Sequence, residues 1–183
     1  EGARRLAMLY WGLVPSWAKE KSIGARMINA RAETLKEKPS FRTAYQRRRC
    51  LVLADGYYEW QAAAGRKQPW YFHMRGGEPF AFAGLWESWI EKPGEPPLES
   101  CTVITTGANP GFVHIHDRMP VILPRDAYGA WLDTASQDTS VLDGLLVPYA
   151  GADFTAHPVS RRVSSARNEG EDLVAPVQTG AAT

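Results

Sequence analysis

The chain of 183 residues is long enough for one domain with a sizeable core, and its composition, 44% hydrophobic and 22% charged, is that of an ordinary globular protein. Its formal net charge is only +1, which excludes a bulk basic excess as a source of nucleic-acid affinity; any such affinity needs arginines gathered on one face. No apolar stretch reaches the roughly 18 to 20 residues of a membrane span and no signal peptide opens the chain, so we expect a cytoplasmic protein with no membrane partner.

The first predicted element is a strand over residues 6–14, a short apolar segment that Pro15 ends. Trp17 follows in a predicted loop, close to Lys19. An exposed ring beside a cation can stack on a nucleobase, whereas a ring folded onto the core has no such role. Residue types alone leave both interpretations of Trp17 open.

Two short helices are predicted next. Residues 29–33 look like the start of a helix with Asn29 as its cap, and capping alone would explain this residue without any chemistry. A second helix is predicted over residues 41–48, in which Phe41 and Ala44 share one side at helical spacing. The arginines of this helix then lie on or near its remaining surface, which we interpret as a solvated face.

An apolar run at residues 50–54 is short enough to be a buried strand, and Asp55 and Gly56 then turn the chain. The two cysteines of the chain, Cys50 and Cys101, each begin an apolar run. Buried reduced thiols fit this placement better than a disulfide framework does.

After this turn, aromatic residues alternate at the period of a strand. Tyr57 and Glu59 are expected to face one way, while Tyr58 and Trp60 face the other. Glu59 is therefore a carboxylate set among aromatic rings. A partly buried carboxylate costs free energy unless it is paired or hydrogen-bonded, which makes Glu59 a candidate functional residue.

The rest of the chain carries strand and helix patterns separated by turn-rich segments. Strands are predicted over residues 70–74, 79–85, 101–106 and 154–160, and helices over residues 125–132 and 140–146. The tail from residue 167 onward is expected to fray at its end. No internal repeat and no long linker divides the sequence, so residues 1–183 are predicted to form a single domain.

A second cluster of chemically active residues contains His114, His116 and Asp117. If this segment is extended, the two histidines project to the same side, as metal ligands do, and the carboxylate could complete a triad. Metal sites normally draw further ligands from elsewhere, and the remaining histidines, which stand in no ligand-like cluster, are His73 and His157. The pattern is short and common, so we expect no metal.

The alternative role for this cluster is proton transfer. Imidazole titrates near neutrality, which suits His116 to act as an acid or a base, and Arg118 close by can hold an anion. These residues form a candidate enzyme site that requires no metal and no other cofactor.

Four motifs, in this order, resemble the SRAP family of SOS-response-associated peptidases, which are understood as abasic-site processing proteins. They lie at residues 11–17, 27–34, 49–60 and 115–120, with the sequences WGLVPSW, MINARAET, RCLVLADGYYEW and IHDRMP. The resemblance extends from about Met8 to the last predicted strand. It implies a single α+β domain whose mixed β-sheets curl into a barrel-like core with helices at the periphery.

The resemblance also implies a role in the DNA damage response. Members of the family bind single-stranded DNA and trap the ring-opened aldehyde of an abasic sugar with a cysteine that becomes N-terminal when the initiator methionine is removed. The α-amine condenses to a Schiff base and the thiol then closes a thiazolidine; autoproteolytic peptidase and lyase-type activities are implied as well. The expected partner is single-stranded DNA containing abasic sites, bound by a cytoplasmic, nucleoid-associated monomer.

Seven residues of this sequence match functional positions of the family. Glu59 resembles its acid/base carboxylate, His116 the acid that assists opening of the sugar ring, and Asn29 the amide that orients the amine and the sugar. Two arginines resemble phosphate contacts and two tryptophans resemble side chains that wedge or stack where the strand kinks. These residues, expected to bind DNA, are Trp17, Arg31, Trp60 and Arg118.

The sequence departs from the family pattern at its beginning. Glu1 stands about ten residues before the first motif, whereas the family starts Met-Cys-Gly-Arg a few dozen residues before it. Neither Cys50 nor Cys101 offers an α-amine, so neither can replace the nucleophile. We expect a fragment of a longer protein and not a naturally shortened member, because losing the N-terminal strands would remove part of a packed core.

Two other classes of function stay open. A non-covalent single-stranded-DNA-binding protein would keep the arginines and Trp17 while needing neither Glu59 nor His116. A cysteine peptidase would use Cys50 or Cys101 with that same pair. The second class is disfavoured, because each cysteine is expected inside a strand, without the electropositive setting that a reactive thiolate prefers.

Overall fold

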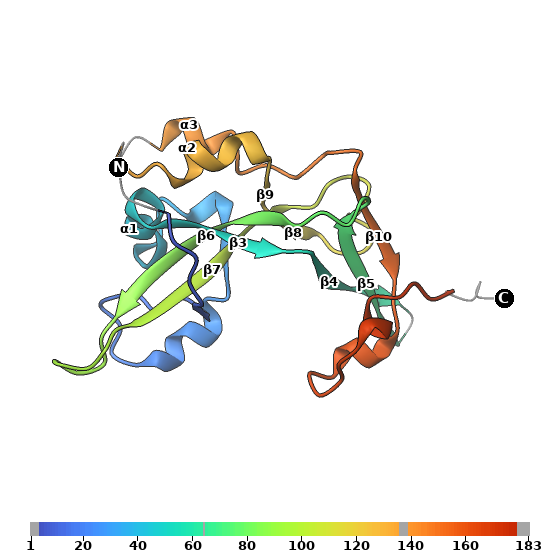
Figure 1. Ribbon diagram of the computed structural model, residues 1–183, viewed down its shortest axis with the longest axis horizontal. Coiled ribbons are helices and arrows are strands. Elements are labelled where there is room, and N and C mark those ends of the chain that lie inside the picture. Colours follow the sequence, from blue (N-terminus) through green and yellow to red (C-terminus); the bar gives the residue numbers. More distant parts are fainter. Residues whose placement is uncertain (1–3, 64, 136–138, 179–183) are drawn as a thin grey trace.

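The computed structural model describes residues 4–63, 65–135 and 139–178. Its strands form a seven-stranded sheet and a three-stranded sheet. Figure 1 shows an arch in which strand β3 (Arg49–Ala54) belongs to one side and β4 (Gly56–Ala63) leads to the other. The mixed α+β class is confirmed, but within the described residues neither sheet closes into a barrel, so the barrel-like core is not confirmed.

The larger sheet is built around β7 (Leu98–Gly107), which is buried continuously from residue 100 to residue 106, as is typical of a central strand. It pairs in antiparallel with β6 (Phe80–Trp89) and in parallel with β1 (Tyr10–Trp11) and β2 (Asn29–Arg31). The remaining strands of this sheet are β3, β8 (Arg118–Pro120) and β9 (Ile122–Leu123).

The smaller sheet contains β4, β5 (Arg66–Met74) and β10 (Phe154–Pro158), with β5 in the middle. The chain passes from the larger sheet into this one at Asp55, the only residue between β3 and β4. Gly56 begins β4 where a side chain has no room, because a Cβ atom there would lie 2.3 Å from the ring carbon Cζ of Tyr71. The predicted turn is therefore the crossing point between the two sheets.

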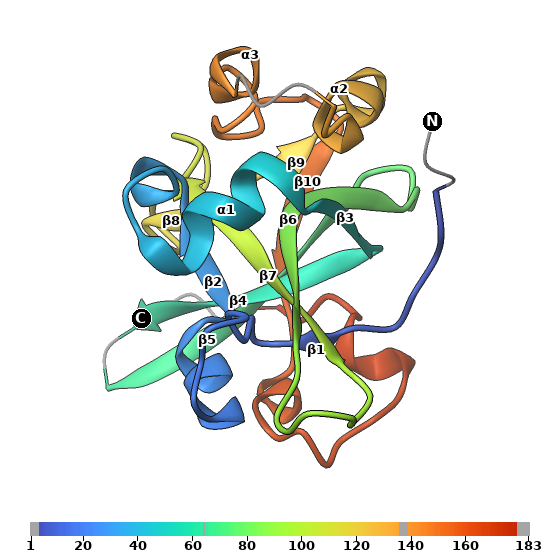
Figure 2. The same cartoon turned by 90° about the vertical axis from the view of Figure 1, so that its left-hand side faces the viewer.

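The α-helices of the described chain are α1 (Pro39–Arg47), α2 (Tyr128–Leu132) and α3 (Ser140–Asp143). In Figure 2, α1 lies in front of the larger sheet, and α2 and α3 lie above it. Pro39 occupies the first turn of α1, where its missing amide proton costs nothing. Short 3-10 helices are η1 (Lys21–Arg26), η2 (Ala32–Thr34), η3 (Arg125–Ala127), η4 (Arg161–Ser164) and η5 (Glu171–Leu173). No helix in the described part of the chain has the length and apolar character needed to cross a bilayer.

Two hydrophobic cores hold the fold together. The first lies between the larger sheet and the helices and includes the fully buried side chains of Ile104 and Trp131. The second contains aromatic residues from both sheets, among them Phe72 and Phe82. The ring of Tyr57 stacks on Phe72 with 4.8 Å between centroids, so this face of β4 is packed toward the second core.

Most predicted elements are confirmed. The strands expected at residues 50–54, 70–74 and 101–106 lie within β3, β5 and β7. Five further expected elements are observed with shifted ends: residues 41–48 as α1, 79–85 as part of β6, 125–132 as η3 and α2, 140–146 as α3, and 154–160 as β10. Residues 179–183, at the end of the predicted tail, lie outside the described part of the chain.

Two predictions near the N-terminus are wrong. The strand expected over residues 6–14 is reduced to the two residues of β1. Residues 29–33 begin as strand β2 instead of a helix, so Asn29 is not a helix cap. The physical reason is pairing with β7, which places Ala30 in the core at 0% exposure and fixes Asn29 in an extended conformation.

Candidate active site

Glu59 lies in the middle of β4, directly across from Trp70 of β5. Only 25% of its side chain is exposed, and its carboxylate oxygen Oε2 is 3.9 Å from Nε2 of His116. The imidazole itself is 41% exposed. The structure therefore brings together two predicted catalytic residues that are distant in sequence, at a place that solvent and a ligand can reach.

The loop between β7 and β8 carries His116 and is fixed at two points. Ile115 is 4% exposed and packs in the second core. The amide of Ala108 donates a hydrogen bond of 2.9 Å to the carbonyl oxygen of Asp117, which closes the base of the loop. The buried neighbour and the closed base together limit where the His116 ring can lie.

Gln61 ties the same loop to β4. Its Nε2 donates to the carbonyl oxygen of His114 at 3.1 Å, and its Oε1 accepts from Nε1 of Trp70 at 3.0 Å. The His114 ring meets Trp70 edge to face, whereas His116 approaches Glu59. The segment forms turns, so the extended pair of histidines considered from the sequence is not formed, and the described residues contain no group of three possible metal ligands.

Two contacts hold the Nδ1 side of the His116 ring. The backbone amide of Arg118 donates to Nδ1 at 3.1 Å when that atom is unprotonated, and the carbonyl oxygen of Arg118 accepts from it at 3.1 Å when it carries a proton. Nε2 is the ring nitrogen that faces Glu59. It is a donor toward the space beside Glu59 in the neutral ring protonated on Nε2 and in the doubly protonated ring.

Burial raises the pKa of the Glu59 carboxyl above its ordinary value, and the nearby imidazole of His116 opposes this effect. The exposed carboxylate of Asp117 adds to the rise, since a second negative charge disfavours ionisation. A carboxyl group with a raised pKa is a stronger base when ionised, which suits general acid/base chemistry near neutral pH.

Arg118 makes a bidentate ion pair with Glu33, in which both nitrogen–oxygen distances are 3.0 Å. Its Nη2 also donates to the carbonyl oxygen of Thr105 at 2.6 Å, which fixes the guanidinium against β7. This hydrogen bonding to Arg118 is the main cause that lowers the pKa of Glu33. The cation of Arg118 is thus held in place at the edge of the site by a partner carboxylate.

Asn29 and Arg31 occupy the two exposed positions of β2, on either side of the buried Ala30. The positive charge of Arg31 contributes to the lowered pKa of Glu33, which places it near the ion pair with Arg118. Arg31 also pairs in register with Thr105, the residue that Arg118 binds. The two predicted phosphate-binding arginines therefore flank one position of β7.

The two predicted stacking residues differ in how their rings are held. Trp17 stands in the loop before η1 and is 58% exposed. Trp60 lies on the opposite face of β4 from Glu59, and its Nε1 donates to Oγ of Ser164 at 3.0 Å. The ring of Trp60 is thereby held toward the C-terminal segment, while that of Trp17 is available to a ligand.

Both cysteines are free thiols, but neither has the setting of a nucleophile. Burial raises the pKa of Cys50 to about 12 and also raises the pKa of Cys101. A thiol with a raised pKa is almost entirely protonated at neutral pH and attacks slowly. This finding argues against the cysteine peptidase alternative.

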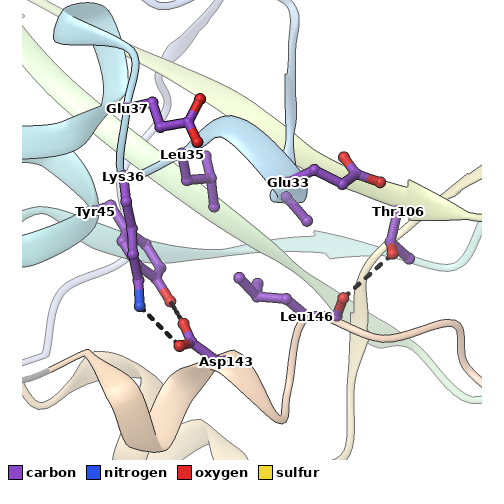
Figure 3. A pocket seen from close by; sticks show the side chains of 9 residues that line it. Glu33, Leu35, Lys36, Glu37, Tyr45, Thr106, Asp143 and Leu146 are labelled. Atoms are coloured by element: carbon purple, nitrogen blue, oxygen red, sulfur yellow. Dashed lines mark hydrogen bonds and ion pairs between the residues drawn. The ribbon is translucent and has the colours of Figure 1, made fainter.

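A cavity of about 330 Å³ adjoins the Glu33 side of the site. Its walls come from η2, α1, β7 and the segment around α3. Figure 3 shows the side chains of Lys36 and Tyr45 both directed at Asp143, to which they bind at 2.7 and 3.3 Å. The polar groups on this wall therefore satisfy one another, and the Glu33 carboxylate remains on the side nearest Arg118.

Two residues that organise the site were not assigned a role from any sequence pattern. Glu33 stands in one of the family-like motifs, but no local pattern pairs it with Arg118. Gln61 could have been found, because a strand places it on the same face as Glu59, two positions further along.

Comparisons with known proteins find a family and relatives that match most of this chain. The model of the family described as SOS response associated peptidase (SRAP) matches residues 1–166. The abasic site processing protein YoqW of Bacillus subtilis is 46% identical over 171 residues, covering 93% of this chain and 76% of the relative. HMCES of Gallus gallus, an abasic site processing protein, is 35% identical over 200 residues, and the match covers 97% of this chain and 59% of the relative.

The fold is shared with solved structures. A crystal structure of a protein from Bacteroides thetaiotaomicron superposes with a TM-score of 0.84 at 29% sequence identity. The superposition covers 92% of this chain and 75% of the other. A second structure, of a protein from Bordetella bronchiseptica, gives a TM-score of 0.72 at 33% identity, and the superposition covers 84% of this chain and 77% of the other.

Proposed function

The chain belongs to the SRAP family, and we propose that it recognises abasic sites in single-stranded DNA during the DNA damage response and becomes covalently joined to them. The proposed crosslink is a thiazolidine made by an N-terminal cysteine that removal of the initiator methionine exposes; residues 1–183 do not include this cysteine. Support comes from the family match and from relatives named as abasic site processing proteins. The protein is expected to act as a nucleoid-associated monomer in the cytoplasm.

The proposed reaction is a condensation followed by a ring closure. The α-amine adds to the aldehyde carbon of the opened sugar, and loss of one water gives a Schiff base. The thiol sulfur then attacks the imine carbon, and its proton moves to the nitrogen. An α-amine suits the first step, since its ordinary pKa near 8 leaves a useful unprotonated fraction at neutral pH.

Three residues are proposed to serve this reaction. Glu59 takes a proton from the amine and returns it to the departing hydroxyl, and its raised pKa favours both transfers. His116 donates from Nε2 to the ring oxygen as the sugar opens, and Asn29 orients the amine and the sugar. The observation that carries the proposal is the 3.9 Å separation of Glu59 and His116, which leaves both groups facing one reaction site.

The decisive test compares two forms of the protein on an abasic single-stranded oligonucleotide, analysed on a denaturing gel. Protein with its native N-terminus is expected to give a shifted, covalent band, while residues 1–183 alone bind the DNA but give no such band. A covalent band from residues 1–183 would contradict the role of the N-terminal cysteine. No covalent band from either form would instead support the alternative of a non-covalent single-stranded-DNA-binding protein.

Replacing Arg31 with alanine is expected to weaken DNA binding without slowing the chemistry at saturation. The logarithm of the binding constant falls as the logarithm of the salt concentration rises. Loss of one phosphate contact makes this dependence shallower by about 0.7 for a single strand. Fluorescence anisotropy between low and moderate salt measures this slope. Arg42→Ala, on the exposed surface of α1, is the matched control, and an equal slope change in both variants would contradict a specific contact by Arg31.

Trp17, Trp60 and Arg118 are the other residues proposed to contact DNA, Trp60 from the face of β4 opposite to Glu59. Trp17 offers an exposed face for a base, and such stacking contributes about 1–3 kcal/mol per base. Arg118 would contact a phosphate while Glu33 keeps its guanidinium oriented.

A further inference from the structure

The outer face of the smaller sheet, opposite to the face that carries Glu59, holds a histidine pair. His73 lies on β5 and His157 on β10, and Nε2 of His73 is 3.2 Å from Nδ1 of His157. The described residues contain no group of three possible metal ligands, but the two histidines, which stand far apart in the sequence, meet in the structure. The reason is the antiparallel pairing of β5 with β10, which sets His157 directly across from Tyr71, two residues from His73.

Both imidazoles are oriented by backbone carbonyl groups. Nδ1 of His73 is 2.7 Å from the carbonyl oxygen of Met74, and Nε2 of His157 is 2.8 Å from that of Val174. A carbonyl oxygen can only accept, so these two ring nitrogens must carry the protons. In neutral imidazoles the inner nitrogens, Nε2 of His73 and Nδ1 of His157, are then both unprotonated lone-pair donors.

Two lone pairs that face each other at 3.2 Å repel unless a positive species lies between or beside them. We propose that His73 and His157 bind one divalent transition-metal ion, with zinc as the reference case. Two nitrogens at 2.0–2.1 Å from a tetrahedral zinc ion lie about 3.3 Å apart, which agrees with the observed separation. Imidazole is a preferred ligand of zinc, copper and nickel.

The second ring nitrogen of each histidine supports the same assignment. Metal-binding histidines almost always donate their other ring N–H to a carbonyl or a carboxylate, which fixes the tautomer and the ring orientation. Met74 and Val174 supply those acceptors here. Because the described residues contain no group of three protein ligands, water completes the coordination of this ion.

A metal at this position would join three parts of the chain. His73 holds it to β5 and His157 to β10, while the Val174 carbonyl extends the network to the segment after η5. The site lies on the face of the smaller sheet that carries Tyr71, whose ring stacks on His73 at 5.2 Å. We expect the ion to stabilise the docked C-terminal segment and to take no part in the chemistry at Glu59.

The test is a zinc titration of the full, untagged chain by isothermal calorimetry, with the thermal midpoint Tm followed in parallel. Wild-type protein is expected to bind one zinc ion and to gain in Tm, and His157→Ala to bind at least tenfold more weakly. His157→Gln serves as a second variant should the alanine variant fold poorly. His114→Ala removes another exposed histidine and is expected to bind zinc as the wild type does.

Copper provides an independent readout of the ligands. Electron paramagnetic resonance of the Cu²⁺-loaded protein is expected to show coupling to two histidine nitrogens in the wild type and one in His157→Ala. Equal zinc affinity in wild type and His157→Ala, or loss of the site in His114→Ala, would overturn the assignment. Absence of zinc binding by the wild type would overturn the assignment as well. The 3.2 Å contact between the two rings would then be explained by a hydrogen bond in which one proton is shared.

Discussion

Glu59→Gln is expected to slow crosslinking to an abasic site by about 10² to 10⁴-fold, the usual contribution of a general acid/base residue. Glutamine keeps the size and one hydrogen-bonding oxygen of the side chain, but it cannot accept the amine proton. DNA affinity is expected to change little, because Glu59 is largely buried and its negative charge does not attract phosphates. Single-turnover kinetics at saturating protein, beside an anisotropy measurement of affinity, separates the two effects.

Glu91→Gln is the matched control for loss of one negative charge, because Glu91 lies exposed in the connection between β6 and β7. This variant is expected to crosslink at the wild-type rate. If Glu59→Gln loses affinity and rate in the same proportion, Glu59 acts in binding and the proposed role in proton transfer is wrong.

Glu59→Gln is expected to slow crosslinking but to stabilise the folded protein at neutral pH. Because the folded-state pKa of Glu59 lies above its ordinary value, the associated stability is present below about pH 4 and is lost as pH rises through the folded pKa. Glutamine does not ionise, so Glu59→Gln should match the wild type near pH 4 and have the higher Tm at pH 7. A lower Tm than the wild type at pH 7 would show that Glu59 is held there by favourable pairing.

Elements whose burial pattern is local were predictable from the sequence. The alternation after Asp55 predicted the faces of β4, and helical spacing of Phe41 and Ala44 predicted α1, since both patterns record one buried face. Asn29 was misassigned because its cap-like neighbourhood is local, whereas the partner that makes it a strand, β7, is distant in sequence. Long-range pairing overrode a local preference.

The candidate site was predictable only in part. Aromatic neighbours singled out Glu59 directly, but its pairing with His116 was expected only through the family resemblance. No periodicity indicates that Ile115 anchors the loop in the second core and so directs His116 toward β4. The His73–His157 pair was missed for the same reason, because strand register cannot be read from either strand alone.

His116→Gln is expected to slow crosslinking to a natural abasic site by about 10²-fold, while sparing a substrate that needs no ring opening. Glutamine can keep an N–H donor near the position of Nε2, but it cannot release the proton that the sugar ring oxygen must gain. Natural abasic sugars are mostly closed hemiacetals, so this proton limits how much aldehyde forms at the site. An oligonucleotide with an acyclic aldehyde, which lacks the hydroxyl needed to close, bypasses that step.

Crosslinking rates on the two substrates therefore distinguish His116 from Glu59. His116→Gln should be slow on the natural site and near wild type on the acyclic aldehyde, whereas Glu59→Gln should be slow on both. His114→Gln, whose ring packs on Trp70 in the same loop, is the control and should be near wild type on both substrates. Equal slowing of His116→Gln on both substrates would move its role from ring opening to a later proton transfer, one shared with the carboxylate 3.9 Å away.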